Sequence, residues 1–448
     1  MVFSSMEFIF IFLPVFLLIY YIAPINWKNL VILIGSVIFY MWGSRENPEY
    51  ILLFIMAIIM NYLLGKFIEN NPQWKKAALF VALAYNLLPL ILFKVAIDQI
   101  VLPIGISFFT FQNLSYVLDV YRGKVQAEKS FVKYGAYISM FPQLIAGPII
   151  TYNEVREQFV TRKITVTRIR NGATIFLLGL GAKVLIANRI GTLWSDIQAI
   201  GVESITTQLA WMGIISYCIQ LYFDFYGYSL MAIGLGRMMG FYFPRNFDSP
   251  YLSVSMSEFF RRWHMTLGNW FKEYVYFPLG GSRCSKGRMI FNLFVVWVLT
   301  SLWHGIQWNF LLWGMGIFVL IVIEKLWIGE WLNKHRFVGH LYVLSVTPIM
   351  WLTFVMTDWQ QYKLYLGRMF PLFAGNENVI FATDYMKYLS TYGLFFVAGC
   401  MFITAFPKKL FRKHRKHIAM KGLLTAVFIL SIYCMYRGLN DPFLYFRF

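Results

Sequence analysis

Apolar runs of close to 20 residues recur along the whole chain, and this feature most constrains the fold. An α-helix needs a run of this length to cross the hydrocarbon core of a bilayer. Only 14% of the 448 residues are charged, whereas a soluble domain averages about 25%. The sequence therefore predicts an all-α polytopic membrane protein, not a soluble enzyme, a secreted disulfide scaffold or a disordered chain. A β-barrel is disfavoured because its strands alternate apolar and polar residues.

Twelve apolar spans are predicted within a single integral membrane domain that covers residues 1–448. No internal repeat or low-complexity linker divides the chain, and the span boundaries are expected to hold within about 2–4 residues. The predicted spans are 7–23, 29–42, 50–68, 77–97, 101–120, 171–190, 208–236, 289–303, 305–327, 341–357, 389–406 and 421–437.

Loop charge predicts the orientation of the spans. Lys and Arg outnumber Asp and Glu by 40 to 21, and in a membrane protein this excess indicates cytoplasmic loops rather than nucleic-acid binding. Residues 407–421 hold seven Lys or Arg and no acid, so this loop should be cytoplasmic, whereas the balanced loop 358–388 should face outward. Both termini are then extracytoplasmic. Residues 1–6 have no basic n-region, so a first transmembrane helix is expected rather than a cleaved signal peptide.

Two segments do not fit simple crossings. Residues 134–150 contain two prolines and a glycine within a short stretch, and broken backbone at membrane depth must be buried in protein or line a wet cavity. Because basic patches flank this segment on both sides, we expect it to be re-entrant. Residues 251–275 mix aromatic and cationic side chains and begin with a capping-box spacing, which predicts an amphipathic helix.

Of the six histidines, His304 has the most unusual surroundings. It lies inside a 39-residue apolar stretch, 289–327, that is barely long enough for two crossings. A turn at His304-Gly305 would leave the imidazole within the membrane, because fifteen helical residues rise only about 22 Å. An ionisable group at that depth is a candidate functional group, and a neutral imidazole is a plausible base. A hydrogen-bonded histidine that anchors the turn is an equally good interpretation of the residues alone.

Two further polar positions are candidates. His264 follows Arg261-Arg262-Trp263, and an interfacial histidine among cations is favoured over a catalytic or substrate-orienting group. Asp224 lies in the middle of a predicted span, where a carboxylate needs a cation or several donors. A structural ion pair or hydrogen-bonded anchor is favoured there over catalysis.

The stretch 256–288 could bind a phosphorylated coenzyme from the cytoplasm, because cations lie beside Gly280-Gly281 and glycines let backbone N–H groups approach phosphates. An ordinary positive-inside loop remains open, since no nucleotide-binding motif is present. The four cysteines are far apart and indicate neither disulfides nor a metal site. The cations in this stretch are Arg261, Arg262, Lys272, Arg283, Lys286 and Arg288.

The chain resembles the membrane-bound O-acyltransferases, and within them the bacterial membrane subunits of alginate and peptidoglycan O-acetylation. The resemblance covers essentially the whole chain, and its ordered set of motifs is specific although each motif alone is weak. The motifs are Phe141-Pro142-Gln143-Leu144-Ile145-Ala146-Gly147-Pro148-Ile149, Asp224-Phe225-Tyr226-Gly227-Tyr228-Ser229, Asn246-Phe247-Asp248-Ser249-Pro250-Tyr251, Glu258-Phe259-Phe260-Arg261-Arg262-Trp263-His264, Tyr276-Phe277-Pro278-Leu279-Gly280-Gly281-Ser282-Arg283, Leu302-Trp303-His304-Gly305 and Phe443-Leu444-Tyr445-Phe446-Arg447-Phe448.

The resemblance implies roles that the residues alone leave open. His304, in Trp-His-Gly, would be the catalytic residue, and His264, in Arg-Arg-Trp-His, would be the second active-site position. The fold would have about eleven transmembrane helices, one fewer than the predicted spans, with re-entrant elements around a central tunnel in the bacterial cytoplasmic membrane. Acetyl-CoA would be the cytoplasmic donor, and no metal is expected. The acetyl group would reach a hydroxyl of an extracytoplasmic partner protein or a cell-surface polysaccharide.

The expected mechanism is general-base catalysis by neutral His304 as a hydroxyl attacks the thioester, with His264, a Trp N–H or Asn269 stabilising the oxyanion. Three other functions stay open. The sister branch transfers D-alanine to teichoic acid, but its re-entrant motif differs. A transporter would also explain Asp224 and the broken helices, although repeats are lacking. A scaffold in a polysaccharide assembly would leave His304 without a task.

Overall fold

Helices form the secondary structure in every part of the chain that the structure describes. The computed structural model describes residues 2–96, 100–145, 147–371 and 382–438, and no strand occurs within those ranges. The predicted all-α membrane fold is confirmed. The C-terminal motif at 443–448 lies outside the described residues.

Each of the twelve predicted spans coincides with a helix. Seven helical runs among the described residues are long and apolar enough to cross a membrane, and the structure describes two shorter apolar helices besides them. The helices at 101–120, 208–236 and 289–303 are not among them, so the count of about eleven transmembrane helices stays a prediction. The seven long runs are Glu49–Asn70, Lys75–Val95, Val166–Ile200, Trp308–Lys334, Arg336–Val355, Asp384–Ile403 and Ile418–Tyr436, and the shorter ones are Phe8–Ile22 and Lys28–Gly43.

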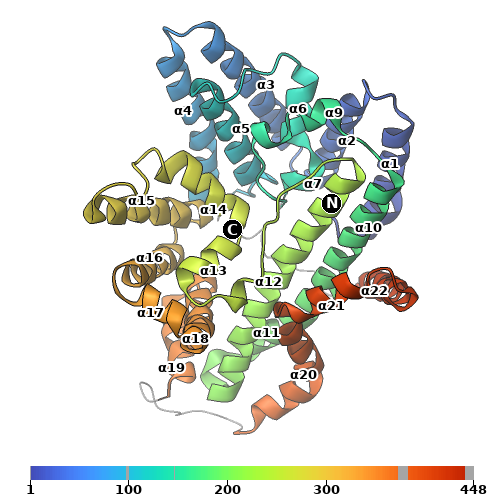
Figure 1. Cartoon of the computed structure of the whole chain (residues 1–448). Coiled ribbons are helices and arrows are strands. Elements are labelled where there is room, and N and C mark those ends of the chain that lie inside the picture. Colours follow the sequence, from blue (N-terminus) through green and yellow to red (C-terminus); the bar gives the residue numbers. More distant parts are fainter. Residues whose placement is uncertain (1, 97–99, 146, 372–381, 439–448) are drawn as a thin grey trace. The chain divides into compact units, whose positions relative to one another are not determined.

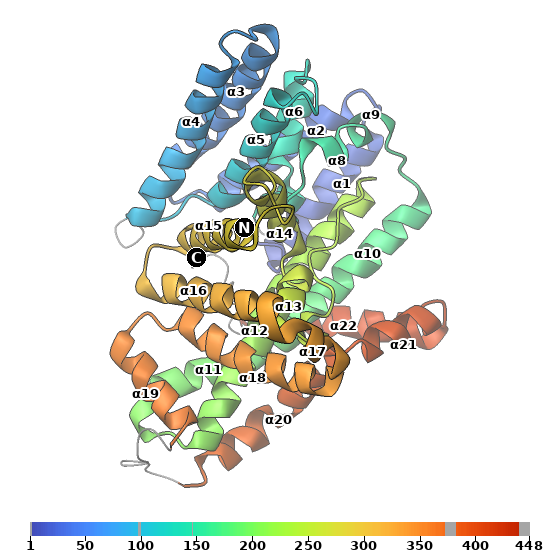
Figure 2. The same cartoon turned by 60° about the vertical axis from the view of Figure 1, so that its left-hand side comes forward.

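The chain forms two compact units, and each is described by itself. The first unit comprises Met1–Gly179, Tyr228–Arg245 and Asn269–Pro278. Helices α3, α4 and α5 of this unit pack against one another, and α6 packs on α2 and α3 (Figures 1 and 2). Its elements are η1 (Phe8–Phe12), α1 (Leu13–Ile22), α2 (Lys28–Gly43), α3 (Glu49–Asn70), α4 (Lys75–Val95), α5 (Ile106–Tyr121), α6 (Phe131–Ser139), α7 (Phe141–Leu144), α8 (Tyr152–Val155), α9 (Gln158–Thr161) and η5 (Lys272–Tyr276).

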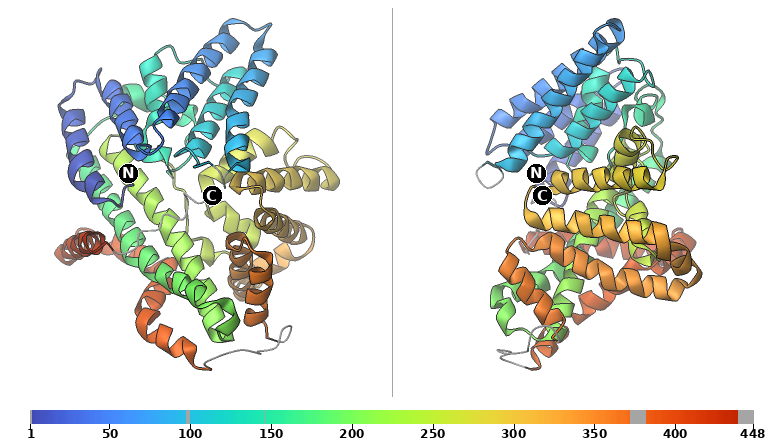
Figure 3. Two further views of the ribbon diagram at one scale, coloured as in Figure 1. Left: turned by 180° about the vertical axis from the view of Figure 1, so that it is seen from behind. Right: turned by 90° about the vertical axis from the view of Figure 1, so that its left-hand side faces the viewer.

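The second unit comprises Leu180–Gly227, Asn246–Gly268 and Leu279–Phe448. Helices α15, α16 and α18 lie side by side in it, as Figure 3 shows. Three helices contribute residues to both units: α10 (Val166–Gly181), α12 (Thr207–Met238) and α14 (Met265–Phe271). The other elements of the second unit are η2 (Ala182–Ala187), α11 (Asn188–Ile200), η3 (Val202–Ser204), η4 (Pro250–Leu252), α13 (Met256–Arg262), α15 (Lys286–His304), α16 (Trp308–Ile323), η6 (Glu324–Ile328), α17 (Gly329–Lys334), α18 (Arg336–Val355), α19 (Trp359–Met369), α20 (Asp384–Ile403), α21 (Phe406–His414) and α22 (Ile418–Tyr436).

The segment expected as one amphipathic helix, 251–275, is instead divided into short helices. Helix α13 begins at the predicted cap, where Ser255 Oγ accepts a hydrogen bond from Glu258 N. The helix ends before His264, whose φ of 44° lies in the left-handed region and cannot continue a right-handed helix. Helix α14 then starts at Met265, so the break places His264 in a corner rather than on a helix face.

Candidate active site

His304 is the last residue of α15, and a short turn separates it from α16. Gly305 caps the helix, and its backbone N–H donates to Ser301 O at 3.0 Å. A Cβ at Gly305 would lie 2.6 Å from the Phe310 ring, so this close approach requires glycine. The apolar stretch 289–327 thus breaks at His304-Gly305, where a turn was expected.

Aromatic rings surround the half-buried imidazole of His304. The ring centroids of Trp303, Phe354 and Trp313 lie 4.6, 5.0 and 5.3 Å from that of His304. Helices α15, α16 and α18 each supply one of these rings, so the packing of this helix layer positions the histidine.

His264 is held by a neighbouring amide and a neighbouring ring. Its Nδ1 lies 3.1 Å from Asn246 Oδ1, and the Phe225 ring meets the imidazole edge-on at 4.7 Å. The side chain is 5% exposed, and it lies outside the helical runs that are long enough to span a membrane. Burial lowers the pKa of His264 to about 3, so the imidazole is neutral at pH 7.

Trp303 brings the two histidines together within the second unit. Its ring centroid lies 4.6 Å from that of His304 and 6.2 Å from that of His264. The two predicted active-site imidazoles therefore flank one indole, although they are 40 positions apart in the sequence. From the sequence alone Asn246 had no expected role, and Trp303 had only the general one of a Trp N–H near the oxyanion. The sequence pattern that could have identified Trp303 and Asn246 is their occurrence in, or just before, the motifs that contain His304 and His264.

Trp313 and Asn269 were covered by the expectation that a Trp N–H or Asn269 serves the oxyanion. Trp313 is buried, and its Nε1–H has no hydrogen-bond partner among the described residues. Asn269 is exposed and belongs to the first unit, so it is described apart from the histidines.

Asp224 forms an ion pair inside the second unit. Its Oδ1 lies 2.7 Å from Lys183 Nζ, and the side chains are 3% and 1% exposed. Lys183 also donates to Asn188 Oδ1 at 2.9 Å. The π-helical turn η2 carries the lysine and α12 carries the aspartate, so this cluster ties two helices together.

The four predicted phosphate-binding cations do not form one described cluster. Arg262 pairs with Glu258 at 2.6 Å, whereas Arg261 and Arg283 are exposed in the same unit. Lys272 belongs to the first unit, where its Nζ lies 5.4 Å from the centre of the Phe277 ring. Three of the four side chains are thus available to solvent within their own units.

The predicted re-entrant motif is buried in the first unit. Gln143 is fully buried, and its Nε2 donates to the carbonyl oxygen of Tyr137. Pro142 is the second residue of helix α7, and Pro148 follows the motif's glycine as a buried residue. A Cβ at Gly147 would lie 2.4 Å from Gln143 Cα, so only glycine fits at this bend. The backbone is broken here as predicted, and its re-entrant course stays a prediction.

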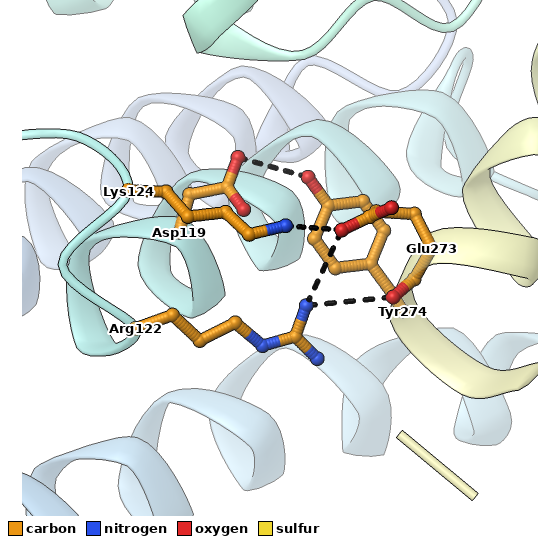
Figure 4. A network of polar contacts seen from close by, with 5 residues as sticks. All are labelled: Asp119, Arg122, Lys124, Glu273 and Tyr274. Atoms are coloured by element: carbon orange, nitrogen blue, oxygen red, sulfur yellow. Dashed lines mark hydrogen bonds and ion pairs between the residues drawn. The ribbon is translucent and has the colours of Figure 1, made fainter. Parts of the chain in front are cut away.

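A polar network at the end of α5 connects that helix to η5 within the first unit (Figure 4). The Tyr274 hydroxyl donates to the buried carboxylate of Asp119 at 2.9 Å. Glu273 accepts from Lys124 and lies 4.0 Å from Arg122. Sequence reasoning assigned none of these residues to a site, and their contacts explain how η5 is held.

Possible metal ligands are dispersed along the chain. Within the described ranges, no three His, Cys, Asp or Glu side chains gather where they could hold a metal ion. The described chemistry is therefore that of imidazole, indole and amide groups around His304 and His264.

These observations define a class of protein: an all-α membrane protein in which two histidines lie on either side of one indole ring. The sequence model of the membrane-bound O-acyltransferase family matches residues 47–366, more than half of the chain. The chain belongs to the membrane-bound O-acyltransferase family and is an O-acyltransferase. The predicted resemblance is confirmed.

Named relatives refine this assignment. The chain is 38% identical over 381 residues to the probable alginate O-acetylase AlgI of Pseudomonas aeruginosa, covering 80% of this chain and 70% of that protein. It is 34% identical over 365 residues to the peptidoglycan O-acetyltransferase of Helicobacter pylori, covering 70% and 68%. It is 27% identical over 244 residues to the teichoic acid D-alanyltransferase of Bacillus subtilis, covering 52% and 61%.

Proposed function

We propose that this protein takes the acetyl group from cytoplasmic acetyl-CoA and passes it across the membrane to a hydroxyl outside. The acceptor is a partner protein or a cell-surface polysaccharide such as alginate or peptidoglycan. The similarity to two proteins named for O-acetylation supports the acetyl group, and both are more similar to this chain than the D-alanyltransferase is. The whole chain acts as one integral membrane domain of the cytoplasmic membrane, with both termini outside.

The pair of imidazoles around Trp303 is the observation that carries this proposal. Acyl transfer to a hydroxyl needs one group that removes a proton and a second that orients the acceptor or the carbonyl. His304 is half-buried, so its ring can meet a substrate without unfolding of the helix layer. His264 is held rigidly beside the same indole, and it serves as the second group.

The reaction balances with these residues and the two substrates. His304 removes the proton from the acceptor hydroxyl as the oxygen attacks the carbonyl carbon of the thioester. The carbon–sulfur bond then breaks, an ester forms, and the proton passes from His304 to the departing thiolate to give free coenzyme A. General-base transfer of this kind contributes typically about 10²–10⁴-fold. The buried Trp313 N–H is the candidate donor to the carbonyl oxygen.

The cations Arg261, Arg262, Lys272 and Arg283 hold the phosphates of the donor in this proposal. The exposed side chains of Arg261 and Arg283 support it, because each presents its guanidinium to solvent on the predicted cytoplasmic side. Pro142, Gln143, Gly147 and Pro148 form a structural, re-entrant element in this proposal. Asp224 anchors the helices and takes no part in the chemistry.

Transfer of D-alanine to teichoic acid is the second candidate, and the Bacillus subtilis relative is the observation in its favour. The two candidates differ in donor, since D-alanine in that branch comes from a carrier protein. A relay is part of the first proposal: the membrane protein hands acetyl to a separate extracytoplasmic transferase, which modifies the polymer.

Native membrane vesicles with the cytoplasmic face outward give the direct test, because they retain any partner. Acetyl-CoA labelled in the acetyl group is added outside, and base-labile label on lumenal polymer or protein is measured. Ester-linked label in the lumen, absent from vesicles that lack the protein, supports the proposal. Entry of intact labelled substrate without ester formation would instead indicate a transporter. If the label in the lumen is the same as in vesicles that lack the protein, a scaffold role would be indicated.

A further inference from the structure

One amide oxygen organises the surroundings of His264. Asn246 Oδ1 lies 3.1 Å from His264 Nδ1, 3.3 Å from Thr266 N and 2.9 Å from Thr266 Oγ1. All these atoms belong to the second unit, and both side chains of Asn246 and Thr266 are buried. The contact between His264 and Asn246 is therefore part of a built cluster rather than an isolated approach.

The chemistry of the cluster determines which atoms carry hydrogens. A backbone N–H can only donate, so the amide atom of Asn246 that faces Thr266 N must be the oxygen. An amide oxygen can only accept, so His264 Nδ1 must carry a proton to make its bond. In a neutral imidazole the other nitrogen, Nε2, then has a lone pair and no proton.

We propose that Asn246 is a positioning residue that holds His264 in the tautomer with its proton on Nδ1, so that Nε2 presents a lone pair to the acceptor hydroxyl. This inference rests on the proposed function for the identity of the hydroxyl. The assignment of the tautomer does not depend on it.

Backbone hydrogen bonds also hold the segments of Asn246 and His264 together. Met265 N donates to Asn246 O at 2.9 Å, and Asp248 N donates to Arg262 O at 3.0 Å, so the two segments are joined on both sides of His264. His264 is held at a φ of 44°, a strained conformation that persists only where surrounding contacts enforce it. Asn246 thus fixes both the protonation pattern and the direction of the ring.

This tautomer changes the role expected for His264. A ring whose only proton is committed to Asn246 has no N–H to offer a developing oxyanion. Burial lowers the pKa of this imidazole, so a second proton is absent at neutral pH. In this proposal His264 acts on the substrate hydroxyl as a hydrogen-bond acceptor and not as a donor, while His304 removes the proton and another donor serves the oxyanion.

The tautomer is measured directly by solid-state NMR on protein labelled with ¹⁵N and ¹³C at histidine and reconstituted in lipid bilayers. The His264 signals are identified by their loss in His264→Gln. Ring ¹⁵N–¹³C correlations then show which nitrogen of His264 carries the proton at pH 7. A proton on Nδ1 is the expected result, and a proton on Nε2 in the wild-type protein overturns the proposal. This measurement needs no substrate, so it stands or fails separately from acetyl transfer.

Variants of Asn246 test whether this residue imposes the tautomer. Asn246→Asp keeps an acceptor oxygen at the same place and should keep the proton on Nδ1. Asn246→Leu removes the acceptor and should release His264 to the other tautomer or to a mixture. An unchanged Nδ1–H signal in a folded Asn246→Leu protein contradicts the proposal. If Asn246→Leu does not fold, Asn246→Asp provides the test: loss of the Nδ1 proton of His264 in that variant would also contradict the proposal.

The kinetic effect separates positioning from simple loss of stability. Asn246→Leu should lower kcat by about 10-fold or more, as loss of an orienting partner typically does, with little change in KM for acetyl-CoA. Asn246→Asp should recover most of kcat. Asn61→Leu is the matched control, because Asn61 is equally buried and donates to Ala57 O at 2.9 Å. A parallel fall of kcat in both Leu variants assigns Asn246 a purely structural role and refutes the proposal.

Discussion

Lys183 Nζ lies 2.7 Å from Asp224 Oδ1, and neither side chain reaches solvent. The sequence favours a structural ion pair or a hydrogen-bonded anchor for Asp224, and the structure identifies Lys183 as the partner. A buried charge that loses its partner is costly because nothing else solvates it, whereas removal of both charges together is often tolerated.

We expect Lys183→Met and Asp224→Asn each to lower the free energy of unfolding by about 3–5 kcal/mol. The double variant Lys183→Met with Asp224→Asn should lose clearly less than the sum of the single changes. Denaturant titration in lipid–detergent micelles gives all values. Strictly additive losses would show that the two charges do not depend on each other.

The α15–α16 contact that positions His304 depends on Gly314. A Cβ at Gly314 would lie 1.8 Å from Ser301 Oγ and 3.2 Å from Trp297 O. Gly314→Ala should therefore destabilise the protein by about 1–3 kcal/mol and reduce activity, because α15 must shift. Adding Ser301→Ala removes the closest clash and should restore part of both.

Gly422→Ala is the matched control for that experiment, since no described residue outside its own stretch of helix comes within 4 Å of a Cβ there. Helix α22 should accept the alanine without loss of stability. The contact argument fails if Gly314→Ala and Gly422→Ala unfold at the same denaturant concentration.

The polar network in Figure 4 should contain one strong and one weak interaction. Tyr274→Phe removes the donor to buried Asp119 and should cost about 1–3 kcal/mol of unfolding free energy. Glu273→Gln breaks ion pairs whose carboxylate and lysine are 38% and 44% exposed, and should cost less than about 1 kcal/mol. Only the Glu273 effect should shrink with added salt. A larger loss for Glu273→Gln than for Tyr274→Phe would reverse this ranking.

Buried His264 should make the protein less stable in acid. Its pKa is about 3 in the folded protein against an ordinary value near 6.5. Between these values the unfolded chain binds a proton at this ring that the folded chain does not. The free energy of unfolding therefore falls as pH falls below 6.5, by about 1.4 kcal/mol per pH unit. The free energy of unfolding should be measured at pH 7, 6 and 5 for the wild type and for His264→Asn, and the variant should lose less stability as the pH falls. Parallel pH dependences of the two proteins would contradict a buried, neutral His264.

The sequence predicted the helices well because continuous apolar runs have only one good solution in a bilayer. Helix α16 begins at Trp308 and α15 ends at His304, so the turn fell where the length of 289–327 required one. The segment 251–275 was wrong as a single helix, because nothing local shows that a histidine adopts a left-handed φ. In that conformation the imidazole contacts Asn246, which is 18 positions away in the sequence.

The sequence predicted which histidines belong to the site, but it did not predict the contacts that these histidines make. The motif pattern named His304 and His264, yet the contacts of His264 with the Trp303 indole and with the oxygen of Asn246 join segments that are distant in the sequence. Asp224 was likewise identified by its charge in an apolar span, whereas Lys183 is brought to it by the π-helical turn η2. Long-range pairing of this kind is not encoded in local periodicity.

The rate of ester formation by His304→Ala in the vesicle assay tests the central claim most directly. His335→Ala serves as the control, because His335 is an exposed histidine whose Nδ1 lies 3.0 Å from Trp331 O. With equal amounts of folded protein, His304→Ala should transfer acetyl at least about 100-fold more slowly than the wild type, and His335→Ala at the wild-type rate. Wild-type transfer by His304→Ala would contradict the account.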